Sequence, residues 1–202
     1  SEKQLTKIMI YNPISLGVLK KPGELGFDIA VAEGQPLGIP MNAGGPLLGL
    51  ISATSEFNRL LPGRIVGRTT DTDGSIGYVL TLQTREQHIR RERALSNICS
   101  NESLCALRAV VYLSLLGQDG LKYLAELLIK KTNYFINQLL KNPKIKLKFN
   151  SLVFNEFVLE FPDYITLQNF SFRCKENNIN PGIILTDMQM NNCLLVAITE
   201  KL

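Results

Sequence analysis

Short apolar runs separated by turn-forming residues dominate the first hundred positions of the chain. The runs Lys7–Tyr11, Phe27–Ala32 and Leu48–Ala53 are predicted to form strands. Because the second run is almost wholly apolar, we expect a strand buried on both faces, as in a parallel or mixed sheet covered by helices. A helical turn and two strands, joined by a polar turn at residues 71–74, are predicted next: Phe57–Leu61, Arg64–Thr69 and Gly77–Leu82.

Two longer segments have helical character. Ser103–Leu116 carries apolar residues on all sides, as a buried helix would, with Asn101 as its N-cap and Gly117 just past its end. Gly120–Leu140 has apolar residues at close to helical spacing and stops before a proline. The chain is therefore expected to link two compact regions through helix.

From residue 143 onward the pattern changes to short strands around one amphipathic helix, which is predicted at Ile165–Asn177. The four strands that flank this helix are Lys146–Phe149, Phe154–Phe161, Ile183–Thr186 and Cys193–Thr199. This β-β-α-β-β order is typical of a small α+β domain. The chain starts without methionine and ends directly after a predicted strand, so we expect a piece of a longer polypeptide whose small domain is truncated at its end.

The composition is that of a globular protein with little charge bias. Of 202 residues, 45% are hydrophobic, and 22 basic against 18 acidic side chains leave a net charge of +4, too balanced to indicate nucleic-acid binding. No apolar run approaches the roughly 18–20 residues that span a bilayer. Four scattered cysteines and one histidine offer no metal-ligand spacing, so we expect no metal, reduced thiols and a cytoplasmic protein.

The loop at residues 33–49, EGQPLGIPMNAGGPLLG, is the stretch richest in glycine and proline. Neither G-x-x-x-x-G-K-[ST] nor G-x-G-x-x-G occurs in it, so those routes to phosphate binding have no support. Glycine allows close backbone approach and proline stiffens the chain, which predicts an ordered, shaped loop. The loop is either a structural turn between strands or a backbone-lined wall beside a ligand.

The only histidine of the chain, His88, lies among arginines in TREQHIRRERALSN, residues 84–97. One interpretation is a solvated helix face, on which Glu86 and Arg90 would pair at i,i+4. The other is an electropositive wall, because guanidinium forks suit carboxylate or phosphate recognition. This segment precedes a predicted buried helix, so we expect it to lie against the core. No second feature marks a nucleophile, so no Ser-His-Asp or Cys-His pair is predicted.

Two polar residues, Asn155 and Glu156, interrupt the apolar strand SLVFNEFVLEF. Side chains alternate between faces along a strand, so these two point to opposite sides. Asn155 shares its face with Phe157 and Leu159. The alternatives are an edge strand with one wet face, or one of the two side chains reaching into a cleft.

Two stretches resemble one enzyme family: DIAVAEGQPLGIPMNAGGPLLG and LPGRIVGRTTDTDGSIGYVLTLQTREQHIRRERALSNICSNESLCAL. They are similar to glycine dehydrogenase (decarboxylating), the P-protein of the glycine cleavage system, in its alpha (subunit 1) form. The likeness continues more loosely to the end of the chain. It implies the α/β fold of pyridoxal-phosphate-dependent transferases of fold type I. Residues 1–118 would then be the C-terminal part of the large domain, 119–142 a linking helix, and 143–202 the small α+β C-terminal domain.

The resemblance also implies a division of labour between two subunits. In the family, a beta subunit carries the lysine that holds pyridoxal phosphate covalently. Matching the Ile-Pro pair of the corresponding loop places Gln35 at that lysine's position, and no lysine occurs between Lys21 and Lys122. An amide nitrogen is not nucleophilic, so the cofactor is expected on the partner. The complex, expected to be a heterotetramer, would decarboxylate glycine and pass the aminomethyl group to the lipoyl arm of H-protein.

Candidate site residues follow from this resemblance. We expect the 85–97 segment near the subunit boundary, bracing the site or facing the anionic cofactor and substrate. The candidates at the active site or interface are Arg85, His88, Arg90, Arg91, Ser96, Asn97, Gly44 and Gly45. Asn155 is the candidate for contact with substrate. This piece alone is expected to be inactive. The alternative is a non-catalytic scaffold or basic binding module of the same fold, and we expect neither nucleic acid nor membrane as a partner.

Overall fold

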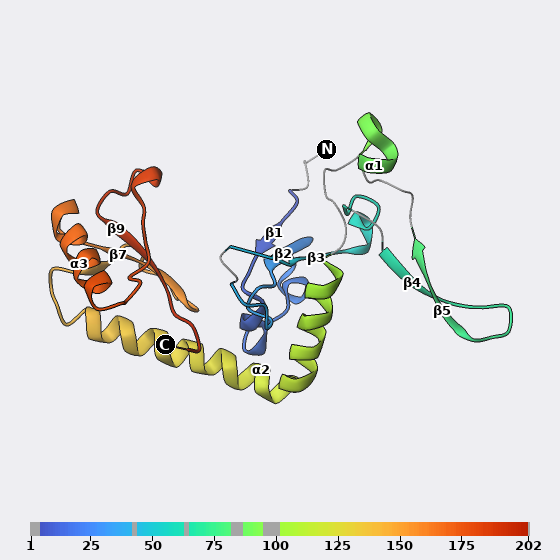
Figure 1. The fold of residues 1–202 in the computed structure, drawn as a ribbon, viewed down its shortest axis with the longest axis horizontal. Helices are drawn as coiled ribbons and strands as arrows, with labels where there is room; N and C mark the ends of the chain where they lie inside the picture. Colours follow the sequence, from blue (N-terminus) through green and yellow to red (C-terminus); the bar gives the residue numbers. More distant parts are fainter. Residues whose placement is uncertain (1–4, 42–43, 63–64, 82–86, 95–101, 202) are drawn as a thin grey trace. The chain divides into compact units, whose positions relative to one another are not determined.

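A computed structural model describes residues 5–41, 44–62, 65–81, 87–94 and 102–201 of the chain. The chain divides into two compact units, Ser1–Gly117 and Gln118–Leu202. Figure 1 follows the chain through both units, and each unit is described by itself below.

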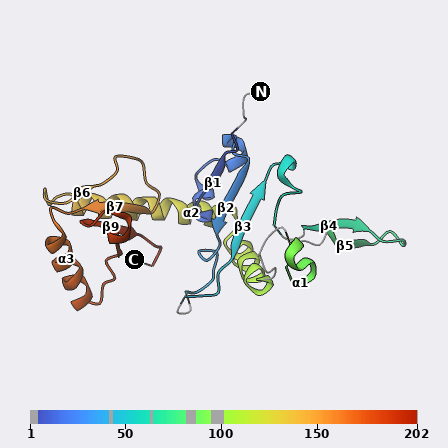
Figure 2. The ribbon, with the colours of Figure 1, turned by 90° about the horizontal axis from the view of Figure 1, so that it is seen from above.

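The first unit contains a mixed three-stranded sheet in the order β1-β2-β3 (Figures 1 and 2). Strand β1 (Ile8–Ile10) runs parallel to β2 (Ile29–Glu33), and β3 (Gly49–Ala53) runs antiparallel to β2. The prediction of a mixed sheet is thus confirmed. The expectation that β2 is buried on both faces is wrong, because only Ala30 is buried and its neighbours in the strand are half-buried or exposed.

Two short 3₁₀ turns, Pro13–Gly17 and Pro22–Leu25, connect β1 to β2. The Asn12 side chain begins the first of them by accepting a hydrogen bond of 3.0 Å from the backbone N–H of Ile14. Ile14 and Ser15 are buried, so this turn contributes to the core of the unit.

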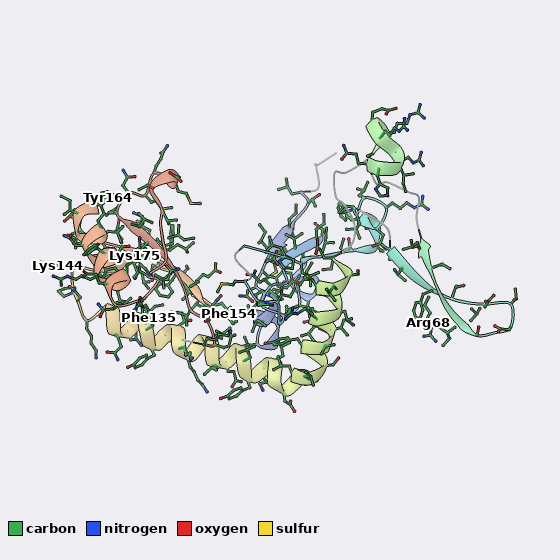
Figure 3. The ribbon with its side chains drawn as sticks, in the orientation of Figure 1. Arg68, Phe135, Lys144, Phe154, Tyr164 and Lys175 are labelled. Carbon is green, nitrogen blue, oxygen red and sulfur yellow. The ribbon has the colours of Figure 1, made fainter. Side chains whose placement is uncertain are left out.

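Strands β4 (Ile65–Thr70) and β5 (Ile76–Thr81) form an antiparallel hairpin, and Arg68 lies midway along β4 (Figure 3). Its polar turn is closed where the backbone N–H of Gly74 donates to the Asp71 carbonyl, with Gly74 at φ +82°. The predicted hairpin is confirmed. The predicted helical turn at 57–61 is a 3₁₀ turn at Ser55–Phe57 instead.

Helix α2 (Ser103–Leu139) contains both predicted helices, and Gly117 separates them with non-helical angles of φ 63° and ψ −176°. The predicted break at Gly117 is therefore confirmed, whereas Asn101 lies outside the described residues. The part before Gly117 buries Cys105 and Ala109 but leaves six large apolar side chains exposed. The prediction of a helix buried all round is wrong for this chain, because only one of its faces is covered.

Among the described residues, α2 is the one helix long and apolar enough to cross a membrane by length and composition. Gly117 interrupts it, and the part before Gly117 would rise only about 21 Å at about 1.5 Å per residue. That is short of the roughly 30 Å of a bilayer core. The part after Gly117 carries five charged residues: Asp119, Lys122, Glu126, Lys130 and Lys131. Both parts are better described as helices of a globular fold.

The second unit is the predicted small α+β fold, a fully antiparallel sheet in the order β6-β7-β9-β8. The strands are β6 (Lys146–Leu147), β7 (Glu156–Glu160), β8 (Ile183–Ile184) and β9 (Cys193–Ala197). Helix α3 (Tyr164–Glu176) lies between β7 and β8 in the sequence. Asp163 caps α3, and the hydrogen bond from the Thr166 backbone N–H lowers the pKa of its carboxyl.

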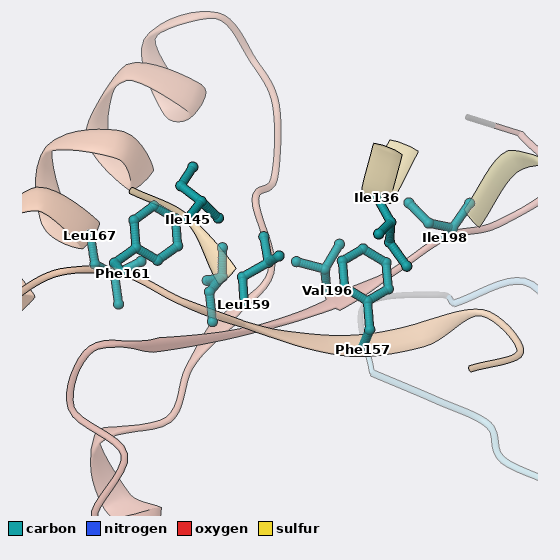
Figure 4. Close-up of a cluster of buried hydrophobic side chains, with 9 residues drawn as sticks. Ile136, Ile145, Phe157, Leu159, Phe161, Leu167, Val196 and Ile198 are labelled. Atoms are coloured by element: carbon teal, nitrogen blue, oxygen red, sulfur yellow. The ribbon is translucent and has the colours of Figure 1, made fainter. Parts of the chain in front are cut away.

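One hydrophobic cluster holds this unit together (Figure 4). Leu159, Leu167 and Leu194 have no exposed surface, and they join side chains from α2, β7, α3 and β9. The Phe157 ring lies 6.3 Å from that of Phe135 on α2, a distance typical of packed aromatic pairs. The core therefore fixes β7 against α2 and positions the residues at the start of β7.

Candidate functional site

The 33–49 loop is closed at its base by the carboxylate of Glu33. Its Oε1 accepts hydrogen bonds from the backbone N–H groups of Gln35 (3.0 Å) and Leu48 (2.9 Å). The backbone N–H of Gly34 also donates to the Leu48 carbonyl at 2.6 Å. Hydrogen bonds to an ionised acceptor are stronger than neutral ones, so the two ends of the loop are held together at the end of β2.

Buried side chains fix the middle of the loop. Leu37, Ile39 and Leu48 are buried, and backbone bonds from Leu37 to Gly34 and from Ile39 to Gln35 form consecutive turns. Gly38 has φ +81°, and a Cβ built on it would lie 2.9 Å from Cβ of Tyr112. Contact with α2 thus helps to fix the described part of the loop, which agrees with the predicted ordered loop, while residues 42–43 lie outside the described residues.

Gln35 is half-buried near the base of this loop. Its backbone N–H is bonded to Glu33, which fixes the position of the residue expected at the cofactor lysine's place. A carboxamide cannot attack the aldehyde of pyridoxal phosphate, and no lysine occurs from residue 22 to residue 121. The residues of this loop therefore do not fit covalent attachment of that cofactor.

Gly44 and Gly45 lie near the tip of the loop. The backbone N–H groups of both donate to the Met41 carbonyl, at 3.0 and 3.2 Å, and Gly44 has φ +111°. Among the described residues other than their chain neighbours, no heavy atom lies within 4 Å of a Cβ built on either glycine. Their role at an interface stays a prediction.

The described part of the arginine segment contains one turn of helix, α1 (Gln87–Arg90), followed by a 3₁₀ turn at Arg91–Arg93. Arg91 has φ 52°, a left-handed conformation that is incompatible with continuing the α-helix. His88, Arg90 and Arg91 are exposed, so the expectation that this segment lies against the core is wrong for residues 87–93. The remaining candidates of the segment, Arg85, Ser96 and Asn97, lie outside the described residues.

Asn155 immediately precedes β7 in the second unit and is half-buried. Its Nδ2 donates to the Ile198 carbonyl at 3.2 Å, and the Ile198 backbone N–H donates to the Asn155 carbonyl. Phe157 and Leu159 are buried while Glu156 is exposed, so the predicted alternation of faces is confirmed. Asn155 therefore ties the end of β9 to the start of β7, a contact that the sequence did not suggest.

The described thiols have the properties of structural cysteines. Cys105 and Cys193 are buried, and burial raises the pKa of the Cys193 thiol. Burial also raises the pKa of Cys174. A raised pKa lowers the thiolate fraction, which is the nucleophilic form. Within the described ranges, no group of three or more His, Cys, Asp or Glu side chains could hold a metal ion.

Glu33 is the residue of this site that sequence reasoning missed. It is the last residue of β2 and precedes a Gly-Gln-Pro turn, where a carboxylate can accept the otherwise unpaired N–H groups of the turn. The position of Glu33 between a strand and a turn is the feature of the sequence that could have indicated its role. The structure brings Glu33, Gln35, Gly44 and Gly45 into one loop, while His88, Arg90 and Arg91 form a separate exposed segment.

Comparison with known proteins gives one consistent family. The family model for the glycine cleavage system P-protein matches residues 1–202. A probable glycine dehydrogenase (decarboxylating) subunit 1 from Chloroherpeton thalassium is 47% identical over 201 residues, which is 100% of this chain and 45% of that protein. A protein of the same name from Moorella thermoacetica is 48% identical over 96% of this chain and 44% of its own length. The chain thus spans a little under half the length of these curated relatives.

Solved structures agree with the expected fold. One match is the crystal structure of an inhibitor-bound glycine decarboxylase (P-protein) of the glycine cleavage system. It covers 96% of this chain and 44% of the chain in that structure, with a TM-score of 0.86 and 38% sequence identity. A sphingosine-1-phosphate lyase from Burkholderia pseudomallei and a NifS-like protein from Rickettsia africae each match at TM-score 0.51, with 16% and 17% identity. The last two show the fold alone. The chain has the fold type I architecture of pyridoxal-phosphate-dependent enzymes, as the resemblance implied.

Proposed function

This chain belongs to the glycine cleavage system P-protein family, and we propose that it forms part of subunit 1, the subunit without the cofactor lysine. The observation that carries the proposal is Gln35, held in an ordered loop of a chain segment that contains no lysine. Pyridoxal phosphate is the cofactor of the family, and we propose that it is bound covalently by a separate beta subunit.

The complete complex would decarboxylate glycine and transfer the remaining aminomethyl group to the lipoyl arm of H-protein. Pyridoxal phosphate supplies the electron-accepting chemistry, while the protein supplies binding and orientation. Within this chain, we propose that the 33–49 loop contributes to this binding and orientation. Glu33 closes the loop at its base, and Tyr112 supports it. We further propose that the exposed arginines at 90 and 91 face the anionic cofactor or substrate in the assembled enzyme, and that the enzyme is cytoplasmic.

The test of this division of labour is covalent labelling. Full-length subunit 1, beta subunit and their complex are incubated with pyridoxal phosphate, reduced with borohydride and mapped by peptide mass spectrometry. We expect one stoichiometric adduct on a lysine of the beta subunit and none on this chain, because Gln35 is expected at the position of the cofactor lysine and residues 22–121 around it contain no lysine. Release of labelled carbon dioxide from glycine should require both subunits.

A stoichiometric adduct on a lysine of this chain would overturn the proposal. The rival function is a non-catalytic scaffold or basic binding module. It predicts that subunit 1 can be omitted without loss of decarboxylation, so the activity measurement separates the two.

We also propose that Asn155 contacts the substrate in the assembled enzyme. Asn155→Ala is expected to lower turnover of glycine roughly ten- to a hundredfold, the effect of losing about 1.5–3 kcal/mol from a hydrogen bond to a charged group. It should also lower the stability of the second unit by about 1 kcal/mol, because the Ile198 carbonyl loses a donor. Both quantities are measured on the assembled complex, by steady-state kinetics and by denaturation.

The matched control is Glu156→Ala. Glu156 is the next residue, is exposed and points to the opposite face, so its replacement should leave turnover and stability nearly unchanged. If Asn155→Ala lowers stability but leaves glycine kinetics unchanged, Asn155 only ties β9 to β7 and makes no substrate contact.

A further inference from the structure

Glu33 joins the two ends of the 33–49 loop through a single oxygen atom. Its Oε1 accepts from the backbone N–H of Gln35 at 3.0 Å and from that of Leu48 at 2.9 Å. Antiparallel pairing of β2 with β3 ends at the pair Glu33–Gly49, so both donors lie just beyond the last paired residues of the sheet. The side chain of Glu33 thus continues the connection between the two strands into the loop.

The backbone of Gln35 is held on both sides. Its N–H donates to Glu33, and its carbonyl accepts from the backbone N–H of Ile39 at 3.1 Å. Ile39 is buried, so the second contact is anchored by a packed side chain. With both backbone groups paired, these two contacts set the position from which the Gln35 side chain starts.

The side chain of Gln35 takes no part in holding the loop. The residue is half-buried, and within the ranges that the structure describes its carboxamide forms no hydrogen bond. A carboxamide offers two N–H donors and a carbonyl acceptor, and polar groups away from water are normally hydrogen-bonded. The loop therefore combines a fixed backbone at Gln35 with a polar side chain that can bind a small molecule.

Removal of the Glu33 carboxylate would disturb both ends of the loop together. Leu48 is buried, so its N–H would lose its acceptor at a place that water reaches poorly. Gly34 lies directly against Leu48, because a Cβ built on Gly34 would be 2.9 Å from Cδ2 of that leucine. A shift of Leu48 would therefore move the residue that precedes Gln35.

We propose that Glu33 is a positioning residue of the enzyme, which holds Gln35 so that its carboxamide hydrogen-bonds the bound amino-acid substrate. This inference rests on the proposed function, because that function supplies the substrate. Glu33 does not itself touch the substrate in this account. Its effect passes through the backbone N–H of Gln35, and an acceptor oxygen at that position is what the effect requires.

The test uses full-length subunit 1 assembled with beta subunit and loaded with pyridoxal phosphate, with carbon dioxide release from glycine as the kinetic measurement. Glu33→Ala should lower kcat/KM roughly tenfold or more, the order expected when a binding group is displaced from its working position. Glu33→Gln keeps an oxygen that can accept both N–H groups, so kcat/KM should stay within about threefold of wild type. The matched control is Glu24→Ala. Glu24 is an exposed glutamate of the same unit in a surface ion pair with Lys21, and its loss should also change kcat/KM less than about threefold.

A double-mutant cycle separates positioning from general support of the fold. Gln35→Ala keeps the backbone N–H that Glu33 binds, so the loop stays closed while the carboxamide is lost. We expect this variant to lose kcat/KM by a factor similar to that of Glu33→Ala. The double variant should lose at most about twofold more than Gln35→Ala alone, because Glu33 then has no carboxamide left to position. Hydrogen exchange should be faster at the amides of residue 35 and Leu48 in Glu33→Ala, and unchanged in Gln35→Ala.

Three outcomes would each overturn the inference. If Glu33→Ala speeds exchange at both amides and leaves kcat/KM unchanged, Glu33 only braces the loop. If Gln35→Ala leaves kcat/KM unchanged, its carboxamide does not bind the substrate. If the double variant loses the product of the two single effects, Glu33 does not act through Gln35. Should the wild-type complex release no carbon dioxide from glycine, the proposed function itself fails, which differs from a loss confined to the variants.

Discussion

Gly38→Ala is expected to lower the free energy of unfolding of the first unit by about 2–5 kcal/mol. Two costs add. Gly38 has φ +81°, a conformation that costs an alanine about 1–2 kcal/mol. The new methyl group would also lie 2.8–2.9 Å from Cδ2 and Cβ of Tyr112. The Cβ atom is held by the backbone of α2, so rotation of the tyrosine ring cannot relieve the contact, and overpacking adds about 1–3 kcal/mol.

The measurement is denaturant unfolding of the variant beside the wild-type chain, with hydrogen exchange at the amides of β2 and β3 to locate the loss in the first unit. Gly23→Ala is the matched control. In the described part of the chain, chain neighbours aside, no heavy atom lies within 4 Å of a Cβ built on Gly23, and its φ is not left-handed. Gly23→Ala should therefore change the free energy of unfolding by less than about 0.5 kcal/mol. Equal midpoints for Gly38→Ala and Gly23→Ala would show that the 33–49 loop is not supported by α2.

Local patterns predicted the elements of the fold well, because each pattern reports a local cause. Two predicted strands joined by a polar turn correspond to the β4–β5 hairpin, because a short turn brings the strands on either side of it together. Gly117 was predicted to end a helix because glycine tolerates positive φ, and it has φ 63°. The β-β-α-β-β order of the second unit follows from strand and helix periods alone.

Burial was predicted less well, because it depends on what covers an element. The helix at 103–116 is apolar all round, and that pattern predicts burial on every side. In this chain only the face of Cys105 and Ala109 is covered, and Leu107 on another face is 58% exposed. The β4–β5 hairpin also carries apolar side chains that this chain leaves exposed. The hydrophobic pattern therefore reports only which surfaces are apolar, whereas the exposed fraction reports which surfaces this chain covers by itself.

The site was predictable only where residue identity decides the chemistry. Gln35 is expected at the lysine's place, and the prediction that this chain does not bind the cofactor covalently follows from its amide side chain alone, whatever the geometry. The closure of the loop by Glu33 was not predicted, because it depends on two backbone N–H groups, those of Gln35 and Leu48, converging on one carboxylate oxygen. The contact between Asn155 and Ile198 was missed for the same reason, since these residues are 43 positions apart.

Leu159→Ala should cost the second unit about 2–5 kcal/mol, because it removes a fully buried side chain and leaves a cavity that the core fills only partly. Leu159 lies on β7 between β6 and β9, opposite Leu147 and Leu194, so the loss falls on the centre of the sheet.

Leu152→Ala is the matched control, the same substitution at a side chain that is 104% exposed in the same unit, and it should change stability by less than about 0.5 kcal/mol. Denaturant unfolding of both variants measures the difference, with hydrogen exchange at the amides of β7 and β9 to assign it. Because Asn155 immediately precedes the same strand, protection of the Ile198 amide, which donates to the Asn155 carbonyl, should fall together with that of β7. If Leu159→Ala leaves the protection of Ile198 at its wild-type value, the core of the sheet does not position Asn155, and the start of β7 is held by its own contacts alone.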